Sequence, residues 1–285
     1  MTTARTVAAL AALTLREASR RRVLLALAGL TVALLALSGW GFSRLAAESG
    51  AATLTSGQAR LVASQLLNLV MFGFSLIAAL GTAFLAGPTL AGETESGIAL
   101  AMLARPVRRS AVLLGKWLGL VIFGTGYVGV AGLAQCLVVL ATVDYWPPQP
   151  AAALALLAAQ TIVLLTLGVL LSTVISPMAS GVVAVGLFGA TWVAGVVGGV
   201  GEALGNDGVA RVGTVSRMLL PTDGLWRGAM HSFQDPAALA QFGGELDGFP
   251  FLSRAPLTVA YLAWAAVWIA MIWALAAASF ARKDL

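Results

Sequence analysis

Charged residues divide the 285-residue chain into long uncharged stretches. An ionised side chain at the centre of a bilayer costs about 2.5–3.5 kcal/mol on insertion scales, so such stretches indicate segments that lie in hydrocarbon. Five stand out, and their limits are Arg22 to Arg44, Arg60 to Glu93, Lys116 to Asp144, Asp144 to Glu202, and Arg254 to Arg282.

The fourth stretch is too long for one helix, because residues 145 to 201 give 57 positions without a charge and a membrane helix needs roughly 20. Pro177 disfavours a helical conformation at Ser176 and divides the stretch in two. The pattern therefore predicts six spans, near 23–43, 62–87, 117–141, 153–174, 179–201 and 257–281.

The expected fold is an all-α integral membrane protein with a single domain over residues 1–285. Hydrophobic residues make up 59% of the chain and charged residues 10%, and the mean hydropathy is +0.92. This composition excludes an ordinary soluble domain. The net charge of +5 is interpreted as membrane topology and not as a nucleic-acid surface, which would need a soluble basic patch.

The basic residues predict the orientation, because cytoplasmic segments of membrane proteins carry an excess of Lys and Arg. With the N-terminus inside, eleven fall inside and six outside. The inner ones are Arg5, Arg16, Arg20, Arg21, Arg22, Arg105, Arg108, Arg109, Lys116, Arg282 and Lys283, and the outer ones are Arg44, Arg60, Arg211, Arg217, Arg227 and Arg254. Both termini are therefore expected in the cytoplasm, with residues 202–256 forming a long outer loop.

Two amphipathic segments are expected outside the spans. Before the first span, "RTVAALAALTLREASRRR" has Val7, Leu10 and Leu13 at helical spacing, which predicts an interfacial helix, or alternatively a basic flank that only sets topology. In the outer loop, residues 209–230 predict a short helix that lies on the outer surface. Tyr261, Trp264 and Trp268 form a one-sided stripe on the last span, expected to serve in packing or as an interfacial belt.

Motifs for several kinds of chemistry are missing. "LLGKW" at 113–117 lacks both the upstream glycine and the following Ser or Thr of a phosphate-binding loop. His231 has no Cys or acidic partners at metal spacing. We therefore expect that the chain is not an enzyme, and that it carries no metal and no cofactor of its own.

No Asp, Glu, Lys, Arg or His falls within a predicted span, although ion-coupled transporters usually need such groups. Energy for transport would then come from elsewhere, or the process would be passive. Polar residues in the spans are candidates either for hydrogen bonds between helices or for contact with a substrate pathway. They are Gln65, Asn68, Gln135, Gln160, Thr161 and Thr191.

The inner loop 88–116 is the most elaborate connection. It reads "GPTLAGETESGIALAMLARPVRRSAVLLGKWLG" into the third span, with Glu93 and Glu95 before an apolar run and Arg105 near its end. Acidic residues in the first turn and basic ones in the last complement a helix dipole, and Pro106 ends the helix. A short cytoplasmic helix is predicted, unless the segment is only a solvated basic loop.

This segment resembles the first cytoplasmic loop of ABC-2-type transporter permeases. Their pattern is an acidic pair, Gly-Thr, a leucine-rich turn, Arg-Pro-Val-Ser-Arg and Leu-Gly-Lys. The matching residues are Glu93, Glu95, Gly97, Arg105, Pro106, Val107, Arg109, Leu114, Gly115 and Lys116, with Ile98 in place of Thr and Arg108 in place of Ser. "LTLREASRRRVLLAL", "LLPTDGLWR" and the final "FARKDL" are similar to the subgroup that includes the nitrous-oxide-reductase maturation permease.

The resemblance implies a permease subunit of an ATP-driven transporter, an exporter in the bacterial cytoplasmic membrane. A second permease chain, identical or different, would complete the pathway, and two separate ATPase subunits would bind ATP and Mg²⁺. The loop would supply a coupling helix in which Glu93 and Glu95 contact or orient the ATPase. Arg105, Arg108 and Arg109 would pair with its acidic surface or with anionic membrane lipid.

Two other functions remain compatible with the sequence. A membrane scaffold or assembly factor without a transport cycle would bind partners regardless of nucleotide state. An integral membrane enzyme would need a polar cluster, which only the outer loop could supply, from Asp207, Asp223, His231, Asp235, Glu245 and Asp247. The sequence does not specify a substrate.

Overall fold

The computed structural model describes residues 3–19, 22–50, 56–87, 108–242, 249–253 and 255–282, and their regular secondary structure is entirely helical. Four helices lie outside the six long ones: α1 (Thr3–Ser19), α9 (Asp207–Leu219), α10 (Thr222–Phe233) and α11 (Pro236–Phe242). The long helices are α2 (Arg22–Gly50), α3 (Ser56–Gly87), α6 (Arg109–Val143), α7 (Pro150–Val174), α8 (Pro177–Ala203) and α12 (Val259–Ala281).

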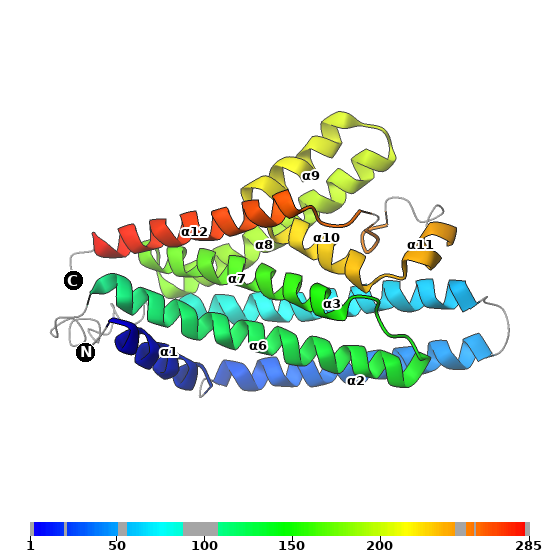
Figure 1. Ribbon diagram of the computed structural model, residues 1–285, viewed down its shortest axis with the longest axis horizontal. Coiled ribbons are helices and arrows are strands. Elements are labelled where there is room, and N and C mark those ends of the chain that lie inside the picture. The colour runs from blue at the N-terminus through cyan, green and yellow to red at the C-terminus, as the bar shows by residue number, and fades with distance from the viewer. Residues whose placement is uncertain are drawn as a thin grey trace.

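The six long helices confirm the predicted number of spans, since each is long and apolar enough to cross a membrane. They form an elongated bundle (Figure 1) in which both termini and the start of α6 lie at one end. We call this the terminal end and the opposite one the distal end. Several helices exceed their predicted spans, most clearly α6, which begins at Arg109 and not near 117. A helix that continues past the hydrocarbon can place charged residues in its end turns.

Prolines and left-handed residues set several of the helix boundaries. Pro177 occupies the first turn of α8, and Ser176 before it is extended, with φ −61° and ψ 155°. Asp144 ends α6 in the left-handed region at φ 52°. The predicted break between the fourth and fifth spans is therefore confirmed.

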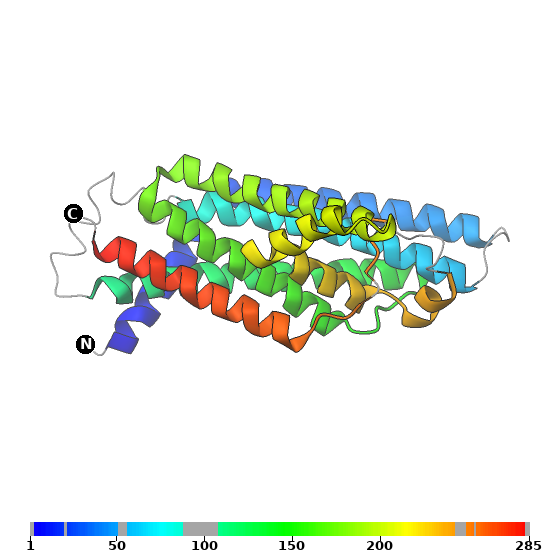
Figure 2. The same cartoon turned by 90° about the horizontal axis from the view of Figure 1, so that it is seen from above.

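Helix α7 forms the centre of the bundle and contacts α3, α6, α8, α10 and α12. Its polar residues Gln160, Thr161 and Thr166 are buried along with leucines and valines such as Leu165 and Val163. By contrast, the faces of α2 and α12 are largely exposed in the single chain. Figure 2 shows α1 crossing the bundle at an angle beside α6.

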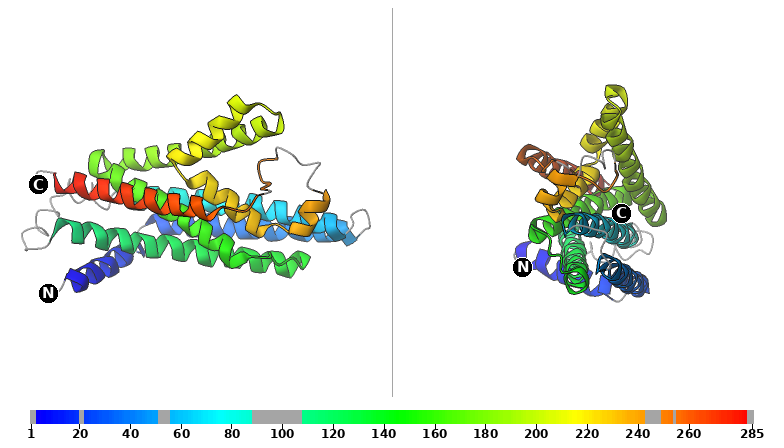
Figure 3. Two further views of the ribbon diagram at one scale, coloured as in Figure 1. Left: turned by 45° about the horizontal axis from the view of Figure 1, so that its top comes forward. Right: turned by 90° about the vertical axis from the view of Figure 1, so that its right-hand side faces the viewer.

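Residues 207–233 differ from the single surface helix that was predicted, because they form two helices with different environments. Helix α9 runs back beside α8, and this hairpin projects from one side of the bundle (Figure 3). Val212, Val215 and Met218 on α9 are exposed, as expected of a surface helix. The prediction is wrong for α10, in which Leu225, Trp226, Ala229, Met230 and Phe233 are all at most 1% exposed. These five residues lie on one face of α10, and that face packs into the core.

The predicted aromatic stripe on α12 holds the end of α9. Tyr261 Oη donates to the carbonyl oxygen of Arg217 at 3.0 Å, Trp264 Nε1 to that of Met218 at 3.2 Å, and Trp268 Nε1 to that of Leu219 at 2.8 Å. The last carbonyls of a helix have no partner within it. These three side chains supply the missing donors, so the stripe serves in packing between α9 and α12.

Candidate functional site

The start of α6 is the described part of the predicted coupling segment. Arg108 is exposed and extended, with φ −65° and ψ 129°, and the helix begins at the next residue. Arg109 Nη1 donates to the carbonyl oxygen of Ala281 at 3.1 Å and lies 3.5 Å from that of Phe280. A cation at a helix C-terminus both satisfies unpaired carbonyls and complements the helix dipole. Arg109 therefore ties α6 to the last turn of α12.

Helix α1 holds the first turns of α6 from another side. A Cβ added to Gly115 would lie 2.6 Å from Leu10 Cβ, and one added to Gly119 would lie 2.7 Å from the carbonyl oxygen of Ala11. These glycines let the two helix backbones approach closely. Ala11, Thr14 and Ala18 are the buried residues of α1, which agrees with the predicted amphipathic helix. The beginning of α6 is thus held by α1 and by α12.

The remaining predicted coupling residues divide into two groups. Lys116, between the two glycines, is only 4% exposed and belongs to the packed interior of the terminal end. Glu93, Glu95, Gly97, Arg105 and Pro106 lie outside the described residues, as does the predicted short helix that contains them.

Polar residues predicted within the spans mostly join one helix to another. Gln135 Nε2 on α6 donates to Ser38 Oγ on α2 at 2.6 Å. Ser75 Oγ on α3 donates to Gln160 Oε1 on α7 at 2.9 Å. The hydroxyls of Thr191 on α8 and Thr222 on α10 are 3.0 Å apart. Hydrogen bonds between spans stabilise helix association in an apolar solvent.

Thr161 Oγ1 donates to the carbonyl oxygen of Leu157 within α7 at 3.0 Å. The remaining two predicted polar residues lie on α3 and are incompletely paired. Asn68 Nδ2 donates to the carbonyl oxygen of Phe251 at 3.0 Å, while its Oδ1 has no partner. Both amide atoms of Gln65 are buried without a hydrogen bond to any described residue. An unsatisfied buried amide is costly, so these two positions are the strongest remaining candidates for contact with a polar ligand.

The outer-loop residues considered as a possible catalytic cluster contact different partners and do not converge on one another. Asp223 is paired with arginines, His231 Nδ1 lies 3.1 Å from the carbonyl oxygen of Ser253, and Asp235 Oδ1 accepts from the backbone N–H of Ala237. Among the described residues no three His, Cys, Asp or Glu side chains are grouped as metal ligands. Glu245 and Asp247 fall outside those residues.

The comparison with protein families decides the class of the protein. A family described as ABC-2 family transporter protein matches residues 8–285. The chain belongs to the ABC-2 transporter family. It is accordingly a multi-pass permease subunit of an ABC transporter and associates with ABC ATPase partners. No curated protein matches the chain.

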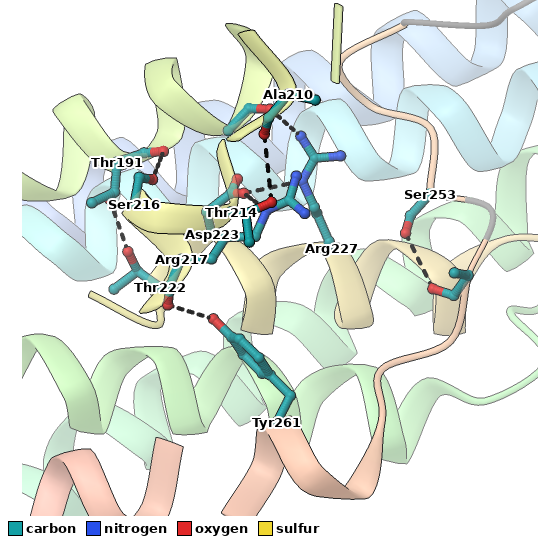
Figure 4. Close-up of polar contacts among 12 residues, drawn as sticks. Thr191, Ala210, Thr214, Ser216, Arg217, Thr222, Asp223, Arg227, Ser253 and Tyr261 are labelled. Carbon is teal, nitrogen blue, oxygen red and sulfur yellow. Dashed lines mark hydrogen bonds and ion pairs between the residues drawn. The ribbon is translucent and has the colours of Figure 1, made fainter. Parts of the chain in front are cut away.

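In this ABC-2 permease the sequence reasoning missed a buried ion cluster between α9 and α10. Asp223 Oδ2 accepts from Arg217 Nε and from Arg227 Nε, each at 3.0 Å (Figure 4). The Asp223 side chain is 2% exposed and each arginine side chain 20%. Asp223 and Arg227 in "LLPTDGLWR" are four residues apart, and this spacing could have predicted an ion pair between them on a helix. Arg217 could not be assigned to the cluster, because the turn between α9 and α10 places it there.

Proposed function

We propose that the chain is one of two permease subunits of an ATP-driven exporter in the bacterial cytoplasmic membrane, with two ATPase subunits docked at its terminal end. The family match supports the transporter class. The excess of Lys and Arg in segments at the terminal end supports a cytoplasmic location for that end. ATP and Mg²⁺ would be bound by the partners, and this chain would perform no hydrolysis of its own.

The main support for this proposal is that the start of α6 is bound to two other helices, to α1 by close backbone packing and to α12 by hydrogen bonds. The predicted coupling segment leads directly into Arg108 and Arg109, so a displacement of that segment acts on α6 first. Arg109 transfers it to α12 through two backbone carbonyls, and the close glycine contact transfers it to α1. A transporter needs packed helices that move as units between two discrete states.

Residue roles in the coupling segment follow from this arrangement. Glu93 and Glu95 would contact or orient the ATPase, with Gly97 and Pro106 shaping the segment between them and α6. Arg105 and Arg108 would pair with the acidic surface of the ATPase or with anionic lipid. Arg109 differs, because its guanidinium donates to α12, so it would act inside the permease. The nitrous-oxide-reductase subgroup is part of the proposal but brings no substrate with it.

The test is purification of the tagged chain from its native membrane in mild detergent, with co-purifying proteins identified. A P-loop ATPase is expected with the wild-type chain and is expected to be lost when Glu93 and Glu95 are both changed to Lys, because the charge reversal opposes docking. Asp207→Lys is the matched control, since Asp207 is an exposed acidic residue in the distal part of the chain.

Retention of the ATPase by the double variant would contradict the assignment of the two glutamates. Recovery of other partners without any ATPase, independent of nucleotide, would instead favour a membrane scaffold or assembly factor.

A further inference from the structure

A cavity of about 600 Å³ lies beside the buried ion cluster. It is bounded by the last turns of α8, by α10, by the chain just before α12 and by the first turn of α12. Its polar side carries Arg217, Arg227 and Glu202, and its apolar side carries Val196, Leu252 and Leu257. The cavity is therefore amphipathic, with charge on one wall and hydrocarbon on the other.

Within the ion cluster the charges do not balance, although Glu202 elsewhere on the same wall carries a second negative charge. One carboxylate, Asp223, accepts from two guanidinium groups, so the three side chains together carry one excess positive charge. Gly195 lies against the Asp223 carboxylate, where a Cβ would collide with it, and Arg227 Nη2 donates to the Gly195 carbonyl oxygen at 2.6 Å. The cluster, which α9 and α10 supply, is thus held against α8 (Figure 4).

Donors remain on both arginines after these bonds. Arg227 uses Nε and Nη2, and its Nη1 makes no hydrogen bond with the described residues. Arg217 Nη2 also has no partner among them, but it is buried from solvent, so Arg227 Nη1 is the donor available to a ligand in the cavity. Glu202, the described carboxylate on the cavity wall, is exposed and forms no ion pair with either arginine. Two partly buried cations that share one carboxylate are only half compensated, and a guanidinium binds oxyanions with particularly favourable geometry.

We infer that this cavity binds an amphiphile whose oxyanion head group, a phosphate or a carboxylate, lies against Arg227 and Arg217 and whose apolar part lies against Leu252 and Leu257. The amphiphile can be a membrane lipid or a soluble molecule, since both present the same chemistry. The site goes beyond the proposed function, and its occupancy is measured without the ATPase. Failure of one proposal therefore leaves the other standing.

The test uses the purified full-length chain in a neutral maltoside detergent, titrated with hexyl phosphate in a calorimeter. One saturable site per chain is expected. Arg227→Gln should weaken it by about tenfold or more, because a charge-assisted hydrogen bond contributes about 1.5–3 kcal/mol. This variant leaves Asp223 paired with Arg217, and it removes the excess charge together with the hydrogen bonds from Arg227 to Asp223 and Gly195. Arg211→Gln is the control, since Arg211 is an exposed arginine of α9 outside the cavity wall.

A second variant fills the cavity without changing a charge. A Cβ added to Gly199 would lie 3.5 Å from Arg227 Nη2, an ordinary contact, so Gly199→Val should fold normally and weaken hexyl phosphate binding by a similar factor. Absence of a saturable site in the wild type, or equal binding by the wild type and both variants, would overturn the inference.

Two further arms identify the source of the ligand. Inorganic phosphate alone should bind much more weakly than hexyl phosphate, and equal binding would refute the role of the apolar wall. Native mass spectrometry of the chain released from nanodiscs of phosphatidylglycerol or phosphatidylcholine then separates the sources. One retained phosphatidylglycerol, lost in Arg227→Gln, shows that the amphiphile is a lipid, whereas hexyl phosphate binding without retained lipid shows that it is soluble.

Discussion

Changing Asp223 to Asn is expected to lower the free energy of unfolding by about 3 kcal/mol, because it leaves two partly buried guanidinium groups facing a neutral amide. The carboxylate accepts from both arginines at 3.0 Å and is 2% exposed, so solvent cannot replace it. Thermal unfolding of the purified chain in detergent measures the loss. The same change at Asp207, an exposed residue in the first turn of α9, should cost less than about 1 kcal/mol.

A double variant separates charge imbalance from lost packing. Adding Arg227→Gln to Asp223→Asn removes one of the two unpaired cations, so the double variant should be more stable than the sum of the single effects predicts. Strict additivity would show that the cluster is not an electrostatic unit. A loss for Asp223→Asn no larger than that for Asp207→Asn would contradict the ion pairs themselves.

Changing Gly119 to Leu is expected to destabilise the protein by at least about 2 kcal/mol and to abolish most of the coupling between substrate and ATPase activity. An added Cβ would lie 2.7 Å from the backbone carbonyl oxygen of Ala11 and 2.8 Å from Thr14 Cβ. A backbone atom cannot rotate away, so α1 must separate from α6. The measurements are thermal unfolding and substrate-stimulated ATPase activity of the assembled complex.

Gly126 offers the matched control on the same helix. No atom lies within 4 Å of a Cβ added there, so Gly126→Leu introduces the same side chain into open space. This control variant should keep its stability within about 0.5 kcal/mol of the wild type and should retain coupling. If both glycine variants behave alike, the close packing of α1 on α6 has no mechanical role.

Charge breaks and proline predicted the fold of the spans because both act locally. An ionised group is excluded from hydrocarbon wherever it occurs, and Pro177 begins α8 by its own ring geometry. The ends of the helices were less predictable, as α6 shows, because a helix continues through polar residues once it has started. The burial of α10 depends on α7 and α3, which lie far away in the sequence.

The candidate site was also predictable only in part, because its local motifs are visible in the sequence and its long-range contacts are not. The pattern from Glu93 to Lys116 indicated the family, which the family comparison then showed over residues 8–285. It could not indicate that Arg109 reaches Ala281, since 172 positions separate them. The polar residues of the spans were identified by type, whereas their partners, such as Ser38 for Gln135, depend on how the helices meet.

Helix α12 is joined to its neighbours at both ends by side chains that bond to main-chain oxygens. Arg109 donates to carbonyls at its terminal end, and Tyr261 and Trp268 donate from its distal half to carbonyls of α9. Every amino acid has a backbone carbonyl oxygen, so these hydrogen bonds place little constraint on the identity of the accepting residue. During divergence, substitutions should therefore accumulate more freely at 219 and 281, whose side chains are exposed, than at the three donors, and this asymmetry would distinguish inherited attachment from chance contact.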